Sequence, residues 1–231
     1  MNNDQYQKLD NPVWHSLQSS QKSFALGSDL IKRYPPDILT FLGCEAPQTG
    51  NLDHINQWIK PGENFFVVGE LPKLSSNWKL NARLDCVQMV CNELNFDAAD
   101  GDNKIVPLTQ NHREEMLELV NLVQPGYFFK NTPLLGDYFG IMQDDKLVAM
   151  AGERMKMNGF TEISAVVTHP QHTGKGYAKQ LVAHVSQKNI EQKAVPFLHF
   201  VTSNIRAGKV YEILGYTERR IIPFWQIQYK G

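Results

Sequence analysis

Apolar residues in the second half of the chain recur at two spacings, which predict an alternation of strands and helices. Strands are expected where β-branched and aromatic residues cluster between turn residues, and helices where apolar residues recur at i, i+3, i+4 and i+7. The expected strands are 105–108, 138–142, 147–156, 162–168, 196–201 and 216–228. The expected helices begin near 109, 177 and 205. This order predicts an α+β fold in which helices flank a mixed, mostly antiparallel sheet.

The first half of the chain is less regular and predicts a smaller α+β region. We expect helices over 11–24 and 53–60 and strands over 64–70 and 80–90, with Asp10 as the first N-cap and Pro12 in the first turn. The polar, acidic stretch 95–103 predicts a boundary. The expected units are therefore an N-terminal region, 1–100, and a second domain, 103–231. The N-terminal region is either a degenerate copy of the second fold or a separate lid.

A glycine turn between an expected strand and an expected helix predicts an anion site. Glycines let the backbone approach an anion closely, and the free N–H groups and dipole of a helix N-terminus favour negative charge. The spacing fits neither the G-x-x-x-x-G-K-[ST] loop nor the G-x-G-x-x-G fingerprint. The turn spans Gln171, His172, Thr173, Gly174, Lys175, Gly176, Tyr177 and Ala178. We expect it to bind a pyrophosphate group, and an ordinary strand-to-helix turn is the alternative.

Two short motifs resemble signatures of the GNAT superfamily of N-acetyltransferases. The first, Q-x-x-G-x-G-x-A from Gln171 to Ala178, is similar to the acyl-CoA pyrophosphate loop of that family. The second, N-x-x-A-x-x-x-Y-x-x-L-G-Y, begins at Asn204 and includes Tyr211. The resemblance covers about residues 103–231. It implies a GNAT-like fold, acetyl-CoA as the cofactor, and direct acetyl transfer to a small amine, an amino acid or a peptide amine.

The resemblance also implies which residues hold acetyl-CoA. They are Ala165, Val166, Val167, Gln171, Thr173, Gly174, Lys175, Gly176, Tyr177, Ala178 and Asn204. In GNAT enzymes the strand before the glycine turn separates from its neighbour, so that its main-chain groups contact the pantetheine arm; a fully paired strand is the alternative here. Lys175 either assists the pyrophosphate or is an exposed cation. Asn204 is expected at the cofactor, at the helix N-cap, or at both.

Tyr211 is the expected catalytic acid, because a phenol with a pKa near 10 stays protonated at neutral pH and can donate to a departing thiolate. Its place on an apolar helical stripe also suits a core residue. Glu162, at the start of the cofactor strand, is the expected general base. Glu153 is the rival base, and His199 is expected to be another residue facing the cleft. Both glutamates also suit solvated strand positions.

The acceptor is expected near the aromatic residues Tyr127, Phe128 and Phe129, which could equally pack in the core. Two non-catalytic alternatives remain open. The chain could be a CoA-binding sensor or interaction protein, or its first half could be an interaction module.

Composition excludes several other functional classes. The chain has 231 residues and a formal net charge of -1, so we expect no nucleic-acid partner. No apolar run reaches the roughly 20 residues of a membrane span, and the polar start of the sequence lacks the pattern of a signal peptide. Cys44, Cys86 and Cys91 lack metal-ligand spacing. We therefore expect a cytoplasmic protein with reduced, buried thiols and no metal.

Overall fold

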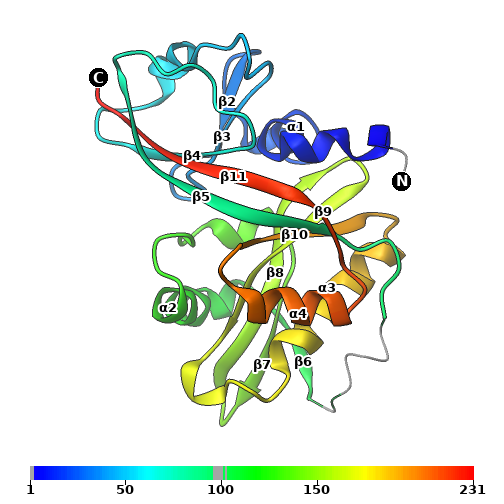
Figure 1. Ribbon diagram of the computed structural model, residues 1–231. Coiled ribbons are helices and arrows are strands. Elements are labelled where there is room, and N and C mark those ends of the chain that lie inside the picture. The colour runs from blue at the N-terminus through cyan, green and yellow to red at the C-terminus, as the bar shows by residue number, and fades with distance from the viewer. Residues whose placement is uncertain (1–2, 96–100, 102) are drawn as a thin grey trace.

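One large sheet runs through both halves of the chain (Figure 1). The computed structural model describes residues 3–95, 101 and 103–231. The sheet has eight strands in the order β4-β11-β5-β10-β9-β8-β7-β6. Their bounds are β4 (Asn64–Val68), β5 (Trp78–Val90), β6 (Ile105–Leu108), β7 (Tyr138–Gln143), β8 (Lys146–Met157), β9 (Phe160–Thr168), β10 (Val195–Val201) and β11 (Thr217–Tyr229). Only β9 and β10 are parallel, so this sheet is mixed and mostly antiparallel, as the sequence predicts.

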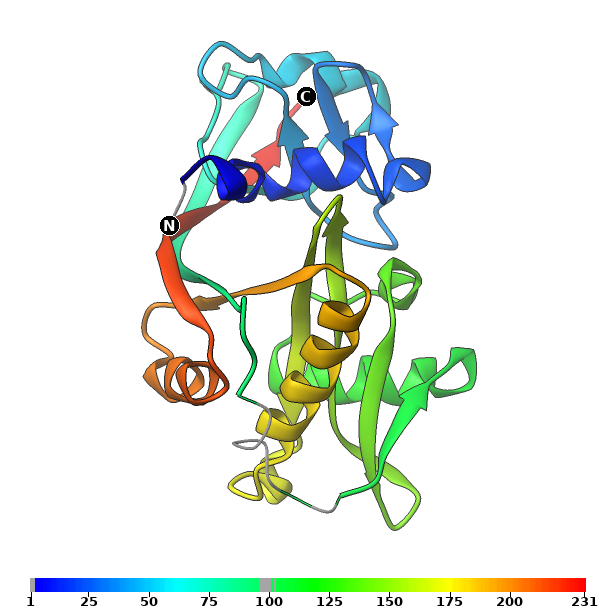
Figure 2. The same ribbon diagram turned by 90° about the vertical axis from the view of Figure 1, so that its right-hand side faces the viewer.

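Helices cover both faces of this sheet. The helices after β6 are η5 (Gln110–His112), α2 (Arg113–Val123), η6 (Thr132–Leu135), η7 (Pro170–His172), α3 (Tyr177–Glu191) and α4 (Ile205–Ile213). Leu119 of α2 packs with Met150 of β8, whereas Leu181 of α3 packs with Ala149 and Ala151. Because successive strand residues face opposite sides, α2 and α3 lie on opposite faces of β8 (Figure 2).

The first part of the chain packs beyond the tip of the β8–β9 hairpin (Figure 2). Its elements are η1 (Asn3–Asp10), α1 (Pro12–Gln18), η2 (Lys22–Phe24), β1 (Leu26–Gly27), β2 (Ile31–Arg33), β3 (Leu42–Cys44) and η3 (Leu52–Trp58). The buried Gln21 amide joins it to the large sheet. Gln21 Nε2 donates to the carbonyls of Leu135 (3.1 Å) and Arg154 (2.7 Å), and Gln21 Oε1 accepts from Lys156 N (3.2 Å) and the Tyr34 hydroxyl (2.6 Å).

Strands from either side of the expected boundary share this sheet. β5 lies between β10 and β11: it pairs with β11 along its whole length and with β10 only over Cys86–Val90. β4 pairs with the outer side of β11. The boundary itself, 95–103, lies largely outside the described residues. The first half of the chain thus supplies strands that flank the last two strands of the second half.

The expected N-terminal helix is shorter than predicted. The prediction of one helix over 11–24 is wrong, because α1 ends at Gln18 and a separate 3-10 turn follows. The Ser19 hydroxyl donates to the His15 carbonyl (2.6 Å), and such local bonds compete with helical ones. Asn11 is the residue before the helix, with Pro12 at its first position. Asp10 is therefore not the N-cap, and its carboxylate instead accepts from Arg219 (2.7 Å).

Candidate active site

The parallel strands β9 and β10 pair at one end and separate at the other. Their ladder joins Phe160–Glu162 to Val195–Phe197. Beyond it, residues 163–168 of β9 face residues 198–201 of β10 without pairing, and we call this opening the β9–β10 wedge. Its closed end is at Glu162 and Phe197, and its open end is at Thr168. The alternative of a fully paired strand is therefore not what the structure has.

A β-bulge reshapes β9 inside the wedge. On β8, Met150 pairs with Val167 and Gly152 pairs with Ser164. Two residues of β9, Ala165 and Val166, therefore lie opposite the single residue between Met150 and Gly152. Ala165 has φ +50°, a left-handed conformation that is rare for a residue with a side chain. The bulge interrupts the ladder with β8 at Ala165 and Val166, at a level where β10 has already separated from the other edge of β9.

A cavity of about 180 Å³ opens into the wedge. Six of the predicted site residues line it: Ala165, Val166, Asn204, Tyr211, Tyr127 and Phe128. Val167 lies outside this lining because it re-enters the ladder opposite Met150. Phe129 also lies outside it, and its main-chain N–H donates to Thr132 Oγ1 (2.8 Å). The bulged part of β9 and one expected acceptor segment thus meet around one cavity.

The glycine turn lies at the open end of the wedge, directly after β9. Gly174 (φ +82°) and Gly176 (φ +77°) both adopt left-handed conformations, which only glycine reaches at little cost. Gly176 is the N-cap of α3, so no side chain caps this helix. The N–H groups of Tyr177, Ala178 and Lys179 therefore belong to a first turn without intrahelical acceptors. Gln171, Thr173, Gly174, Lys175 and Gly176 are exposed, whereas Tyr177 is buried. This helix terminus can therefore receive an anion.

Tyr211 reaches the cavity from α4. Its side chain is 8% exposed, and its ring lies 5.6 Å from that of Phe200 of β10. Burial raises the pKa of Tyr211 to about 12, so the phenol keeps its proton at neutral pH. Asn204, at the start of the same helix, accepts from Ala207 N (3.1 Å) and also lines the cavity. Asn204 is therefore an N-cap whose position still allows a cofactor contact.

Glu162 is fully buried at the closed end of the wedge, where Arg154, His199 and the main-chain N–H of Met155 (3.4 Å) contact its carboxylate. Arg154 donates to both of its oxygens, from Nε (2.8 Å) and Nη2 (2.6 Å), and His199 Nδ1 lies 2.7 Å from Oε1. Burial opposes ionisation, but the Arg154 charge and these hydrogen bonds outweigh it and lower the pKa of Glu162 to about 2. A carboxylate so occupied is a poor proton acceptor, which disfavours the expected role of general base. Arg154 and His199, rather than Glu162, line the cavity.

A contact between Gln88 and the second ring nitrogen of His199, Nε2, keeps this imidazole neutral. Gln88 Nε2 donates to the Leu9 carbonyl (2.8 Å), and Gln88 Oε1 accepts from Arg219 (2.7 Å), which together fix the orientation of the amide. Gln88 Nε2 lies 2.9 Å from His199 Nε2, so this ring nitrogen accepts and Nδ1 carries the proton that goes to Glu162. Burial lowers the pKa of His199, and Glu162 only partly opposes this.

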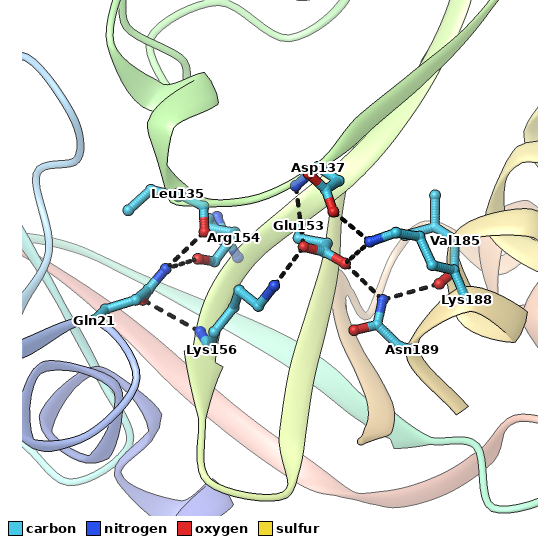
Figure 3. A network of polar contacts seen from close by, with 9 residues as sticks. All are labelled: Gln21, Leu135, Asp137, Glu153, Arg154, Lys156, Val185, Lys188 and Asn189. Carbon is cyan, nitrogen blue, oxygen red and sulfur yellow. Dashed lines mark hydrogen bonds and ion pairs between the residues drawn. The ribbon is translucent and has the colours of Figure 1, made fainter. Parts of the chain in front are cut away.

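Glu153, the rival base, lies on the opposite face of β8 from the cavity (Figure 3). Its buried carboxylate accepts from Lys156 Nζ (2.7 Å), Asp137 N (3.0 Å) and Asn189 Nδ2 (2.8 Å). Alternation along the strand places Glu153 toward α3 and Arg154 toward the cavity. Glu153 therefore links β8 to α3 and does not line the cavity.

The comparisons with known proteins agree with this geometry. The family model described as FR47-like protein matches residues 138–224, which run from β7 into β11. A crystal structure from Novosphingobium aromaticivorans, described as a GNAT-family acetyltransferase, has a TM-score of 0.86 and 27% sequence identity, covering 96% of this chain and 99% of that one. The chain has the GNAT superfamily fold. This fold supports acyl transfer in general.

More distant GNAT structures show the same fold. A GCN5-related N-acetyltransferase-like protein from Streptococcus suis has a TM-score of 0.61 at 14% identity, covering 98% of this chain and 97% of that one. A GCN5-related N-acetyltransferase from Kribbella flavida has a TM-score of 0.60 at 14% identity, with 97% and 95% covered. No curated protein matches the chain in sequence.

Metal sites and membrane-spanning helices are both absent from the described part of the chain. Within residues 3–95, 101 and 103–231, no three His, Cys, Asp or Glu side chains gather in a way that could hold a metal ion. No helix in the same residues is long and apolar enough to cross a bilayer.

Sequence reasoning missed part of the cavity wall. Arg154 and Tyr138 line the cavity from β8 and β7, and Phe41, Phe66 and Phe224 add aromatic surface. Only Arg154 carried a usable signal, because alternation places this arginine on the same strand face as the apolar Met150, where a charge indicates a buried ion pair. The aromatic residues reach the site through strand pairing that no local pattern reveals.

Proposed function

We propose that this chain is an acetyl-CoA-dependent N-acetyltransferase that transfers the acetyl group directly to a small amine, an amino acid or a peptide amine. The observation that carries the proposal is the separation of β9 from β10 beyond Glu162 and Phe197. The resulting wedge leads from the glycine turn to the cavity in which Tyr211 lies. An anion site, an unpaired strand edge and a protonated phenol therefore lie along one path.

The residues that would hold acetyl-CoA fit its chemistry. The first-turn N–H groups of Tyr177 and Ala178 suit a diphosphate, and the exposed Lys175 can add positive charge. The main-chain groups of Ala165 and Val166 suit the amide groups of the pantetheine arm. Bound there, acetyl-CoA supplies an acetyl group already activated as a thioester.

The chain itself contributes a hydrogen-bond donor, an acid and an acceptor wall. Main-chain N–H groups at the bulge can stabilise negative charge on the acetyl oxygen, which is typically worth a few kcal/mol. Tyr211 Oη holds the proton that the leaving sulfur requires. The amine enters from the side of Tyr127 and Phe128, which is the closed end of the wedge.

In this proposal Glu162 positions other side chains and does not take the proton of the amine. With a pKa of about 2, it stays ionised and orients both Arg154 and His199. Gln88 occupies the second nitrogen of His199, so this imidazole has no lone pair directed at the acceptor. We infer that the ammonium form of the acceptor loses its proton to water.

The test is a thiol-release screen with acetyl-CoA as donor and simple amines, amino acids and short peptides as acceptors, with CoA affinity measured by calorimetry. CoA binding together with acceptor-dependent thiol release supports the proposal. Binding without thiol release for any acceptor favours a non-catalytic CoA-binding protein. Absence of CoA binding contradicts both functions.

A further inference from the structure

Tyr138 carries a buried hydroxyl that has no hydrogen-bond partner within the described part of the chain. The residue is 3% exposed and lines the cavity. Leaving a buried hydroxyl unpaired costs free energy, and such groups in native proteins need an explanation. A ligand that accepts this hydrogen bond is a direct explanation, because the cavity lies beside the residue.

The ring of Tyr138 is directed toward Arg154. Tyr138 pairs with Gly152 across the β7–β8 ladder, and a Cβ on Gly152 would lie only 2.2 Å from its ring. The ring therefore lies over Gly152, where no larger residue would fit. Phe128 packs edge-on against it at 5.8 Å. Because Gly152 and Arg154 are two residues apart, they share one face of β8, and this places Tyr138 beside Arg154.

The guanidinium of Arg154 is rigidly held and keeps donors to spare. Its bonds to Glu162 use Nε and Nη2. Among the described residues no hydrogen bond from Nη1 is seen, so its two N–H groups can donate to a ligand. The group lies 4.9 Å above the ring of Phe41, and the side chain is 14% exposed. A planar guanidinium fixed in this way is suited to binding carboxylate or carbonyl oxygens.

Both donors lie on the acceptor side of the wedge. Arg154 is bonded to Glu162, the last paired residue at the closed end, whereas the glycine turn follows Thr168 at the open end. Aromatic side chains surround the donors at this end, including Phe41, Phe66 and Phe224. The acceptor side therefore combines an apolar wall with O–H and N–H donors.

We propose that Arg154 and Tyr138 bind a carboxylate or carbonyl oxygen next to the reactive amine of the acceptor. The preferred acceptors are then α-amino acids or peptide amines with an apolar side chain. A plain alkylamine would leave both donors unpaired. This inference rests on the proposed N-acetyltransferase function and narrows its acceptor class.

Three acceptors that share a phenylethylamine skeleton test the inference: 2-phenylethylamine, phenylalaninamide and phenylalanine. Thiol release is measured with acetyl-CoA, and kcat/KM is expressed per unprotonated amine. We expect at least about a tenfold higher value for phenylalaninamide or phenylalanine than for 2-phenylethylamine, mainly through a lower KM. Preference for the amide indicates peptide amines, and preference for the carboxylate indicates amino acids.

Failure of the inference is distinguishable from failure of the proposed function. Equal values for the three acceptors, or turnover only of other amines, would overturn the inference and leave the acetyltransferase proposal in place. Absence of thiol release with every amine of the wider screen would instead overturn the proposed function, and the inference with it.

Substitutions separate ligand binding from a structural role. Tyr138→Phe should lower the ratio of kcat/KM for phenylalaninamide to kcat/KM for 2-phenylethylamine by about tenfold. It should not lower the thermal midpoint, because the hydroxyl that it removes has no partner among the described residues. Arg154→Lys keeps a positive charge beside Glu162 but removes the planar guanidinium. It should also lower the ratio of kcat/KM for phenylalaninamide to that for 2-phenylethylamine.

Tyr6→Phe is the matched control for a buried tyrosine. The Tyr6 hydroxyl donates to Asn92 Oδ1 (2.7 Å), and neither residue lines the cavity. This variant should therefore lower the thermal midpoint and leave the acceptor ratio unchanged. If Tyr138→Phe also lowers the midpoint and slows all three acceptors equally, the hydroxyl is structural and the proposal is wrong.

Discussion

Glu162 and Phe197 form the last pair between the parallel strands β9 and β10. The strands separate beyond this pair, and the Arg154–Glu162 ion pair lies at the same level. The closed end of the wedge is thus held by main-chain pairing and by a buried charge pair. Because Glu162 accepts from side chains of β8 and β10, the angle between the two strands is held on the acceptor side.

The first half of the chain completes the site from the other side of β10. Its strand β5 places Gln88 against His199 and Cys86 in the cavity wall, while Phe41 and Phe66 close the aromatic surface. The cavity is therefore lined by residues from both halves of the chain, whereas the glycine turn and Tyr211 come from the second half alone.

The glycine turn yields the first prediction, that Gly176→Val weakens CoA binding by about tenfold, or about 1.4 kcal/mol. A β-branched residue is strained at φ +77°, and the strain shifts the N-terminus of α3. Calorimetric titration with CoA measures the effect. Gly62→Val is the matched control, because Gly62 has φ +90°, open space around its Cβ position and no part in the turn. Equal CoA affinity in the two variants would contradict the assignment of the turn.

The second prediction concerns the acid. Tyr211→Phe should lower kcat by about 100-fold or more and leave the CoA affinity unchanged, since the ring still packs against Phe200. Steady-state thiol release and calorimetry measure the two quantities. Tyr216→Phe is the control: it loses a buried bond to Ser186 (2.6 Å) and should cost about 1 kcal/mol of stability with kcat retained. A Tyr211→Phe enzyme with unchanged kcat would remove this residue from the mechanism.

The fold of the second half could be predicted because its signals are local. Strand 105–108 has the predicted bounds, and Asn204 caps α4 through Ala207 as its N-cap chemistry suggests. Gly176 begins α3 in a conformation that its residue type favours. Each of these features depends on residues within one turn or one strand, so it can be predicted from the local sequence.

The placement of β5 could not be predicted in the same way. Its apolar pattern indicates a strand, but nothing local shows that it lies between β10 and β11, more than a hundred residues later in the chain. The sequence therefore does not predict the contact of Gln88 with His199, although this contact determines the tautomer of the imidazole. Strand order in a sheet depends on long-range packing, which residue patterns specify only weakly.

The residues of the candidate site also differ in whether local sequence patterns or long-range strand pairing bring them to the cavity. Motif spacing suggests Gly174 and Tyr211 as candidates from the sequence alone. It suggests neither Arg154 nor Tyr138, because their proximity arises from cross-strand pairing. The expected base, Glu162, lies fully buried at the closed end of the wedge. Its sequence neighbours give no sign of the Arg154 and His199 bonds that depress the pKa of its carboxyl.

The third prediction is that the pH dependence of kcat/KM follows the acceptor. The pKa of Glu162 is about 2, that of His199 is lowered by burial, and that of Tyr211 is about 12. None of these groups titrates between pH 7 and the pKa of an amine. The rate should therefore rise with pH until the amine itself is deprotonated, with no alkaline decline below about pH 10.

Two acceptors with different basicity test this dependence. A peptide α-amine has a pKa of about 8 and an alkylamine one of about 10, so the inflection should differ by about two pH units between them. An inflection that stays at one pH for both acceptors would identify a base on the protein and contradict deprotonation by water.

The fourth prediction is that Glu162→Gln lowers the free energy of unfolding at pH 7 by about 3 kcal/mol, because it leaves the Arg154 charge buried without its partner. In the wild type, the folded-state pKa of Glu162 is lowered from 4.5 to about 2. Its stabilisation is thus complete above pH 4.5 and is lost as the pH falls toward 2. Urea unfolding at pH 7, 5 and 3 should show the free energies of unfolding of the wild type and Glu162→Gln converging at acid pH.

Asp85→Asn is the control for this prediction. It breaks the exposed pair with Arg83 and should change the free energy of unfolding by less than about 1 kcal/mol. A similar, small loss in both variants would show that the Arg154–Glu162 pair does not stabilise the closed end of the wedge.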